Sequence, residues 1–274
     1  MARWLGRRRI ELETCDSTND EIAALARQGA EHGTLVIART QRRGRGRHGR
    51  AWYSPPGENL VMSFLLRPGL EPARVTAITL AVGVAVAETV SSLLTGPRYG
   101  GDRVSLKWPN DVLLDRRKLA GILTEMSTRA HEIEHVVVGL GLNIATRAFP
   151  EELADRATSL ALAGVEVAPE SLITAVVDDL EIWLDRFFAG GVAAIADRWL
   201  ALAGLQPGPG AAGSANGRPV SPRVRVDVAG QPVEGTIQGL DDSGFLLVRD
   251  DSGRIHPVIA GDVESIPIPP RDKR

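Results

Sequence analysis

The chain has 274 residues, of which 43% are hydrophobic and 24% charged, as in ordinary globular proteins with one large domain and one small one. Its formal net charge of -2 argues against the broad basic face that a long polynucleotide track needs. The single cysteine, Cys15, excludes an intramolecular disulfide and a cysteine-based zinc cluster, and it fits a reducing, cytoplasmic setting. The basic start has no apolar core like that of a secretory signal, and no uninterrupted apolar run is long enough to span a membrane.

The first two thirds of the chain predict an α+β domain. A short strand over 10–14 leads into a helix start at Asp16 to Asp20, and Gly29 ends that helix. The Ala-rich run 71–94 predicts one long buried helix, and 169–188 and 192–202 predict two more with a shared apolar stripe. Further strands are expected at 34–38, 59–66, 104–108, 112–114, 119–126 and 136–144, with a hairpin across 115–117.

The composition changes after residue 203. Residues 204–222 are rich in Gly and Pro, which is typical of a linker. Beyond them, four short β-rich pieces alternate with turns such as Asp242-Ser243-Gly244 and Asp251-Ser252-Gly253. We therefore expect a domain over 1–203, a linker over 204–222 and a small all-β barrel over 223–274.

The segment 41–50, QRRGRGRHGR, holds five arginines and three glycines. Glycine lets main-chain N–H groups approach a ligand, and each guanidinium offers planar charged donors to a carboxylate or phosphate. The segment is therefore interpreted as a mobile anion-binding loop. A solvated basic turn, or a patch that touches nucleic acid, is the alternative.

Two lysine-containing segments also bring polar groups together. Lys107-Trp108-Pro109-Asn110-Asp111 lies at a strand end, where an Asn or Asp suits a metal-bridged phosphate. Lys118 opens an apolar strand, Leu119 to Leu123, whose Ala and Gly leave room on one face, so its ammonium could neutralise an anion. The alternatives are a strand corner with an Asx turn at Asn110 and an exposed edge lysine.

Gly139-Leu140-Gly141-Leu142-Asn143 resembles a dinucleotide fingerprint only superficially, because no helix and no acidic partner follow. Alternating glycines in a buried strand instead indicate a close backbone or ligand approach. This leaves Asn143 free to hydrogen-bond a ribose or phosphate. Ser17-Thr18-Asn19 is a helix N-cap that can also present N–H and hydroxyl groups to a ligand.

Other chemistries have less support in the sequence. The five histidines form no metal or triad pattern, and His131 and His135, four residues apart, are expected in a solvated turn. Cys15 is expected to be a buried small hydrophobic residue. No serine lies in a nucleophile-elbow motif.

In chain order, these segments closely resemble the biotin-protein ligases. The resemblance rests on 16–19, 41–50, 107–111, 118–123 and 139–143, on the long helix between the second and third, and on the C-terminal barrel. It implies a mixed-sheet catalytic domain of the biotin/lipoate ligase type over 1–203 and an SH3-like β barrel at the C-terminus. It also implies two steps: biotin and ATP give biotinyl-5′-adenylate, and a lysine of a biotin carboxyl carrier domain then takes the biotin.

The resemblance also implies roles for particular residues. Lys118, Arg45 and Arg47 would be catalytic, acting by charge neutralisation and alignment rather than as nucleophiles. The biotin-binding residues would be Ser17, Thr18, Asn19, Gln41, Arg45, Gly46, Arg47, Lys118 and Gly121. The nucleotide would meet Gly44, Trp52, Asn110 and Asn143, with Mg²⁺ at Asp111. Closure of the arginine loop would shield the adenylate from water.

Some relatives also carry an N-terminal helix-turn-helix domain, but here the catalytic pattern begins near Ile10, so a ligase without DNA binding is expected. Self-association through the central sheet is a further expectation, because it is common among relatives. A lipoate or octanoate ligase with the same core fold is the nearest alternative function. A nucleic-acid-binding module that uses 42–50 is the alternative from another class.

Overall fold

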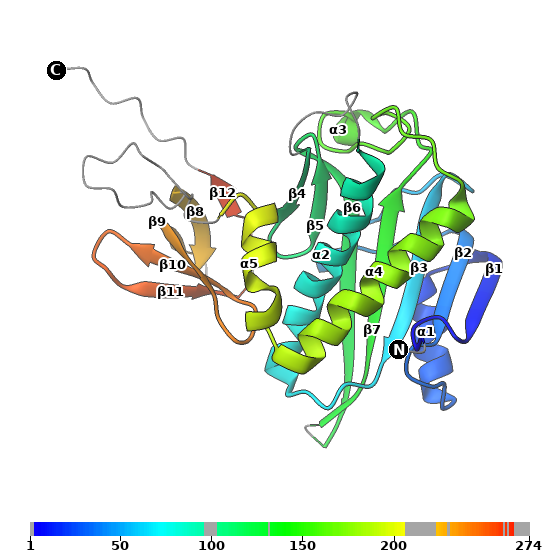
Figure 1. Ribbon diagram of the computed structural model, residues 1–274, viewed down its shortest axis with the longest axis horizontal. Coiled ribbons are helices and arrows are strands. Elements are labelled where there is room, and N and C mark those ends of the chain that lie inside the picture. The colour runs from blue at the N-terminus through cyan, green and yellow to red at the C-terminus, as the bar shows by residue number, and fades with distance from the viewer. Residues whose placement is uncertain are drawn as a thin grey trace.

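The computed structural model describes residues 3–95, 103–130, 132–205, 223–228, 231–259, 261 and 263–265. Most of the predicted linker, 206–222, lies outside these residues. The described part is an α+β fold with a mixed main sheet and a second, smaller antiparallel sheet, as predicted (Figure 1).

The main sheet has seven strands in the order β1-β2-β3-β7-β6-β5-β4. Only the β1–β2 pair is parallel; the other neighbours are antiparallel. Because β7 lies between β3 and β6, it is fixed on both edges. The strands are β1 (Arg9–Cys15), β2 (Leu35–Gln41), β3 (Asn59–Leu66), β4 (Val104–Lys107), β5 (Asp111–Leu114), β6 (Arg117–Arg129) and β7 (Glu132–Asn143).

Three helices cover one face of this sheet: α2 (Val75–Leu93), α4 (Pro169–Gly190) and α5 (Ala193–Leu202) (Figure 1). The helix Pro72–Leu93 is long and apolar enough to cross a membrane by length and composition, but 78% of its apolar window is buried inside the fold. It is the predicted buried core helix. The prediction of one continuous helix over 71–94 needs a correction, because a 3-10 turn at Pro72–Arg74 precedes α2.

The opposite face carries the short helix α1 (Thr18–Arg27), which packs on β2, β3 and β7. Side chains of a strand alternate between the two faces, so β3 sends Met62 and Phe64 toward α2 and turns Val61, Ser63 and Leu65 the other way. Along β7, Gly139, Gly141 and Asn143 share this second face. Space beside the sheet is therefore left on the face that carries α1.

The C-terminal strands are β8 (Arg223–Val228), β9 (Gln231–Leu240), β10 (Leu246–Asp250), β11 (Ile255–Val258) and β12 (Val263–Ser265). They form an antiparallel sheet in the order β11-β10-β9-β8-β12, consistent with an SH3-like domain. The four β-rich pieces over 224–259 were predicted, whereas β12 and the short helix α3 (Glu151–Ala154) were not.

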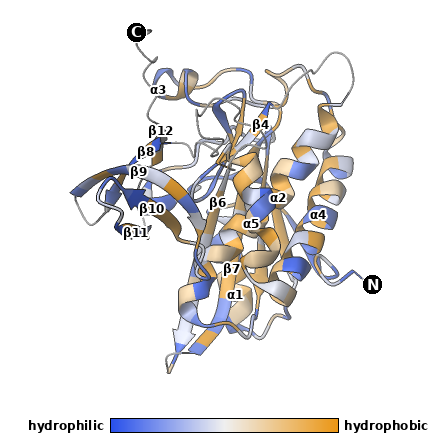
Figure 2. Ribbon diagram, turned by 60° about the vertical axis from the view of Figure 1, so that its left-hand side comes forward, coloured by the Kyte–Doolittle hydropathy of each residue, from blue (hydrophilic) through white to orange (hydrophobic). Residues whose placement is uncertain are grey.

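The small sheet packs directly on the main domain. Gly244, in the turn before β10, lies against Ala77 and Leu80 of α2, and its carbonyl accepts a hydrogen bond from Trp108 Nε1 at 3.3 Å. Val224, Leu246 and other buried residues of the small sheet belong to the same apolar cluster as α2 and α4. Figure 2 shows the central strands largely in the hydrophobic colour. Trp108, predicted within a ligand-binding segment, thus joins the two sheets.

The expectation of a solvated turn at His135 was wrong. His135 lies in β7 and is only 5% exposed. Burial lowers the pKa of its imidazole, while Glu134 acts in the opposite direction. Its partner in that expectation, His131, lies outside the described residues. The expected burial of Cys15 is confirmed, and burial raises the pKa of its thiol to about 11.

Candidate active site

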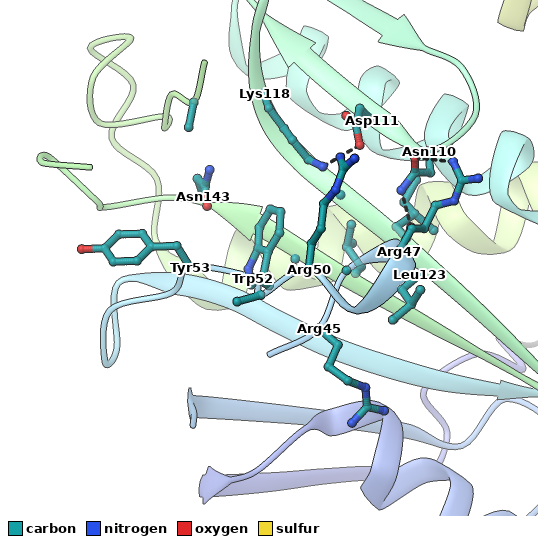
Figure 3. A pocket seen from close by; sticks show the side chains of 18 of the residues that line it. Arg45, Arg47, Arg50, Trp52, Tyr53, Asn110, Asp111, Lys118, Leu123 and Asn143 are labelled. Carbon is teal, nitrogen blue, oxygen red and sulfur yellow. Dashed lines mark hydrogen bonds and ion pairs between the residues drawn. The ribbon is translucent and has the colours of Figure 1, made fainter. Parts of the chain in front are cut away.

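A cavity of about 660 Å³ opens on the α1 face of the main sheet (Figure 3). Its walls come from the start of α1, the arginine loop, the β4–β5 turn, the start of β6, the glycines of β7 and the segment after α3. The predicted site residues that line it are Ser17, Thr18, Asn19, Gln41, Arg45, Gly46, Arg47, Trp52, Asn110, Asp111, Lys118, Gly121 and Asn143. The remaining predicted residue, Gly44, lies in the arginine loop but does not line the cavity.

The cavity floor is made of glycines because side chains from other segments occupy the space above them. A Cβ on Gly121 would lie 2.9 Å from the Trp52 ring, and one on Gly141 would lie 2.6 Å from Trp52 Nε1. A Cβ on Gly139 would collide with the Asn19 amide. These contacts are far closer than packed atoms allow. The alternating glycines of β7 therefore mark a close approach, but the groups that approach are the side chains of Trp52 and Asn19 rather than the backbone or ligand that the sequence predicted.

The start of α1 forms one end of the cavity. Ser17 stands at the N-cap position with extended backbone, and its side chain makes no capping hydrogen bond. Gln41 Oε1 accepts hydrogen bonds from Thr18 N at 2.8 Å and Thr18 Oγ1 at 3.1 Å. Ser63 Oγ lies 2.7 Å from Thr18 Oγ1 and 2.6 Å from Asn19 Oδ1, and Asn19 Nδ2 donates to Glu125 Oε2 at 2.6 Å. The result is a fixed set of buried and partly buried donors and acceptors.

Lys118 brings a positive charge to the other end of the cavity. Its Nζ lies 2.6 Å from Asp111 Oδ1 and 5.6 Å from the centre of the Trp52 ring. The backbone of Lys118 also pairs with the segment after α3, since its N–H donates to Arg156 O and its carbonyl accepts from Thr158 N. An ammonium held this firmly can neutralise a carboxylate or phosphate in the cavity.

The arginine loop is folded as a compact unit. Trp52 N donates to Gly44 O at 2.9 Å, Gly46 N donates to Arg50 O at 2.7 Å, and Arg45 pairs with Ala51 as an isolated bridge. Between these pairs runs a single 3-10 turn, Arg47–Gly49, in which His48 has a φ of 56°. Hydrogen bonds within the loop therefore fix the backbone from which its arginine side chains extend.

The arginines of this loop take different directions (Figure 3). Arg47 Nη1 donates to Asn110 Oδ1 at 3.4 Å, at the β4–β5 turn. The Arg45 guanidinium instead makes two hydrogen bonds to the Asp20 carboxylate, both 2.7 Å long. The hydrogen bond from Arg45 is the largest cause that lowers the pKa of Asp20. The side chain predicted to fold over a ligand's carboxyl is thus paired with α1.

Two amides that the resemblance assigned to the nucleotide, Asn110 and Asn143, are held by main-chain carbonyls. Asn110 Nδ2 donates to Ile122 O at 2.9 Å, and Asn143 Nδ2 donates to Thr158 O at 3.0 Å. Asn143 Oδ1 and Trp52 Nε1 are buried and have no hydrogen-bond partner in the described part of the chain. Buried polar atoms without partners are rare in proteins. A ligand with both donors and acceptors would satisfy them.

The described residues contain no group of three or more His, Cys, Asp or Glu side chains that could hold a metal ion. Mg²⁺ is commonly bound through one or two carboxylates together with substrate phosphates, rather than by a cage of protein ligands. Asp111, at the cavity wall beside Lys118, is compatible with that mode of binding. The donor set therefore fits a magnesium ion that arrives with a nucleotide.

Ser63, Glu125 and Tyr53 were not predicted from the sequence, and Arg50 was predicted only as a member of the arginine loop, without a role of its own. Ser63 and Glu125 bond to the predicted residues at the start of α1, whereas Arg50 and Tyr53 line the cavity. The sequence does contain a signal for Ser63. It is the one hydroxyl among apolar neighbours in this strand, and a buried hydroxyl needs a hydrogen-bond partner on the face toward which it points. For Glu125 the signal is its spacing, because alternate residues of a strand share a face and Glu125 therefore lies on the same face of β6 as Gly121.

The sequence matches two family descriptions: the Biotin/lipoate A/B protein ligase family over residues 12–143 and the Biotin protein ligase C terminal domain over 223–264. It is 32% identical to the bifunctional ligase/repressor BirA of Escherichia coli over 92% of this chain and 72% of that protein. It is 36% identical to a biotin--[acetyl-CoA-carboxylase] ligase of Mycobacterium tuberculosis over 90% and 85%. A biotin protein ligase structure from Aquifex aeolicus, in complex with biotin and ATP, aligns with a TM-score of 0.74 at 26% identity, covering 95% and 99% of the two chains.

These matches span both sheets. The chain therefore belongs to the biotin/lipoate A/B protein ligase family, with the biotin protein ligases as its similar relatives.

Proposed function

We propose that this chain activates biotin with ATP and transfers it to a lysine of an acceptor protein. In the first step a carboxylate oxygen of biotin attacks the α-phosphorus of ATP, the bond to the β-phosphate oxygen breaks, and pyrophosphate leaves. In the second step the lysine amine attacks the acyl carbon of biotinyl-5′-AMP, and AMP leaves. The names of the relatives and the biotin and ATP bound to the similar structure support this reaction.

The bicyclic head of biotin is proposed to occupy the end of the cavity beside α1. A cyclic urea needs fixed donors and acceptors, and the amide and hydroxyl network there supplies both. The residues proposed to contact biotin are Ser17, Thr18, Asn19, Gln41, Arg45, Gly46, Arg47, Lys118 and Gly121. The glycine floor leaves room for the ring system beside the sheet.

Lys118, Arg45 and Arg47 are the proposed catalytic residues. The reaction brings a carboxylate against a phosphate, so like charges must be neutralised before the oxygen can reach the phosphorus. Lys118 already stands at the cavity wall, and Arg47 approaches from the loop. No side chain needs to act as a nucleophile. Holding the two substrates in line supplies the remaining acceleration.

The nucleotide is proposed to meet Gly44, Trp52, Asn110 and Asn143. Trp52 offers a ring face for stacking, and its partnerless Nε1 and the Asn143 Oδ1 can bond to the base or ribose. When bound, Mg²⁺ neutralises phosphate charge; Asp111 is the side chain proposed to hold it. Removal of divalent ions with a chelator should then stop adenylation.

The proposed acceptor is a biotin carboxyl carrier domain of a biotin-dependent carboxylase. The name of the similar Mycobacterium tuberculosis enzyme, which gives acetyl-CoA carboxylase as the protein acted on, supports this proposal. The lone Cys15 fits a cytoplasmic site of action. Self-association through the main sheet belongs to the same proposal.

The observation that carries this function is the position of Lys118. It lies at the wall of a glycine-floored cavity, in a chain more than 30% identical to ligases named for biotin. The test is Mg-ATP-dependent transfer of labelled biotin to a purified carrier domain. Labelling by lipoate but not by biotin would favour the alternative ligase. Salt-sensitive binding to many unrelated oligonucleotides, without labelling, would favour the nucleic-acid alternative.

A further inference from the structure

The cations at the cavity differ in the side chains that they meet. Lys118 pairs with Asp111, a residue of the cavity wall, and Arg47 meets the neutral Asn110. Arg45 alone among these three makes a two-point pair with a carboxylate of α1. Both nitrogens bond to Asp20 at 2.7 Å, and Nη2 also lies 3.7 Å from Glu125 Oε2. Figure 3 shows the Arg45 guanidinium turned toward α1, away from Lys118.

Asp16, just before α1, also makes ion pairs with the first two arginines of the loop. Arg42 Nε lies 2.9 Å from Asp16 Oδ1, and Arg43 Nη2 lies 2.7 Å from Asp16 Oδ2. Neither of these arginines lines the cavity. Asp16, just before α1, therefore holds the base of the loop, whereas Asp20 on α1 holds the side chain of Arg45, a residue that lines the cavity.

The loop is internally bonded between Gly44 and Trp52, so it can move as one body about its base. The Asp20 pair is the contact that joins the Arg45 side chain to α1. A carboxylate or phosphate in the cavity competes with Asp20 for the same two guanidinium N–H groups, since each of these anions can accept two parallel hydrogen bonds from one guanidinium.

We propose that Asp20 is a positioning residue that holds Arg45 away from the cavity until an anionic ligand displaces it. This inference rests on the proposed function, because the displacing anion is the biotin carboxylate and then the adenylate phosphate. Asp20 thereby weakens the binding of biotin and makes engagement of Arg45 dependent on the ligand's charge.

The expected effect is modest, because both side chains are partly exposed, 37% for Arg45 and 49% for Asp20. Exposed pairs are weak and are screened by salt. Asp20→Asn should therefore lower the Kd for biotin by about two- to fivefold at low ionic strength. The difference from wild type should shrink as salt is added.

The experiment measures the Kd for biotin by calorimetry, without ATP, for wild type, Asp20→Asn, Asp16→Asn and the combination of Asp20→Asn with Arg45→Ala. Asp16→Asn is the matched control, because it removes ion pairs of the same loop that do not involve a cavity arginine. We expect tighter binding only in Asp20→Asn, no change in Asp16→Asn, and no effect of Asp20→Asn when Arg45 is already alanine.

Unchanged or weaker biotin binding in Asp20→Asn would overturn the inference, as would an effect that persists in the Arg45→Ala background or is insensitive to salt. Thermal melts check that each variant is folded. A wild-type chain that does not bind biotin would instead refute the proposed function, so the two failures can be told apart.

Discussion

Gly141 offers a test of the cavity floor, because its neighbours leave no space for a side chain. A Cβ there would lie 2.6 Å from Trp52 Nε1 and 2.7 Å from Trp52 Cζ2, where ordinary contact begins at 3.4 Å. The strand cannot yield, since Gly141 is paired with Val61 on one side and Gly121 on the other. In Gly141→Ala the Trp52 ring must therefore move by roughly 1 Å.

The displacement should cost function more than stability. Overpacking a close contact costs about 1–3 kcal/mol, which corresponds to about a 5- to 150-fold loss when it opposes ligand binding. Trp52 lies on the loop and can move outward, so we expect the free energy of unfolding to change by less than about 1 kcal/mol. The kcat/KM for adenylation should therefore decrease by about 5- to 150-fold.

The assay is biotin-dependent exchange of labelled pyrophosphate into ATP, combined with urea unfolding. Gly83→Ala is the matched control, because a Cβ at Gly83 meets nothing closer than 3.6 Å and lies in α2 on the other face of the sheet. Adding Trp52→Ala to Gly141→Ala should cause no further loss relative to Trp52→Ala alone. Additive losses in this double-mutant cycle would refute the reasoning.

Three further outcomes are expected. Lys118→Ala should slow single-turnover adenylation by about 100- to 1,000-fold with an unchanged unfolding curve, since it removes a charge and no core packing; near-normal adenylation would contradict this. Gly44→Val should make adenylate leak from the enzyme, because a Cβ would lie 2.6 Å from Gln41 Nε2 and disturb loop closure; unchanged release of free adenylate would count against it. Folding lowers the pKa of His135 below its ordinary 6.5, so the unfolded chain binds a proton more readily than the folded chain as the pH drops. The free energy of unfolding should therefore fall from pH 7 to pH 5. Denaturant titrations should show a smaller fall over this range in His135→Gln than in wild type.

Local patterns were enough to predict most elements of the fold. The mostly apolar segment 59–66 predicted β3 with its observed bounds, because a strand buried on both faces needs no alternation. The break at Pro72–Arg74 was not foreseen, since apolar composition alone does not show where a helix tightens into a 3-10 turn. The prediction for His135 was wrong because its charged neighbours, Glu132 and Glu134, suggested a solvated turn, whereas His135 lies in β7 with its side chain buried.

The candidate site was predictable where a segment carries its own chemical signature. The arginine loop and Lys118 are examples, since glycine, arginine and lysine in those settings point to an anion. The partners that orient these groups were not predictable in the same way. Asp20 and Ser63 come from other elements, and only the folded chain shows that they meet Arg45 and Asn19.

The most direct measurement is exchange of labelled pyrophosphate into ATP by the purified chain, with biotin, with lipoate and without either acid. We expect rapid Mg²⁺-dependent exchange with biotin only, and loss of this exchange in Lys118→Ala. Exchange that needs lipoate rather than biotin, or that survives without Lys118, would contradict this expectation.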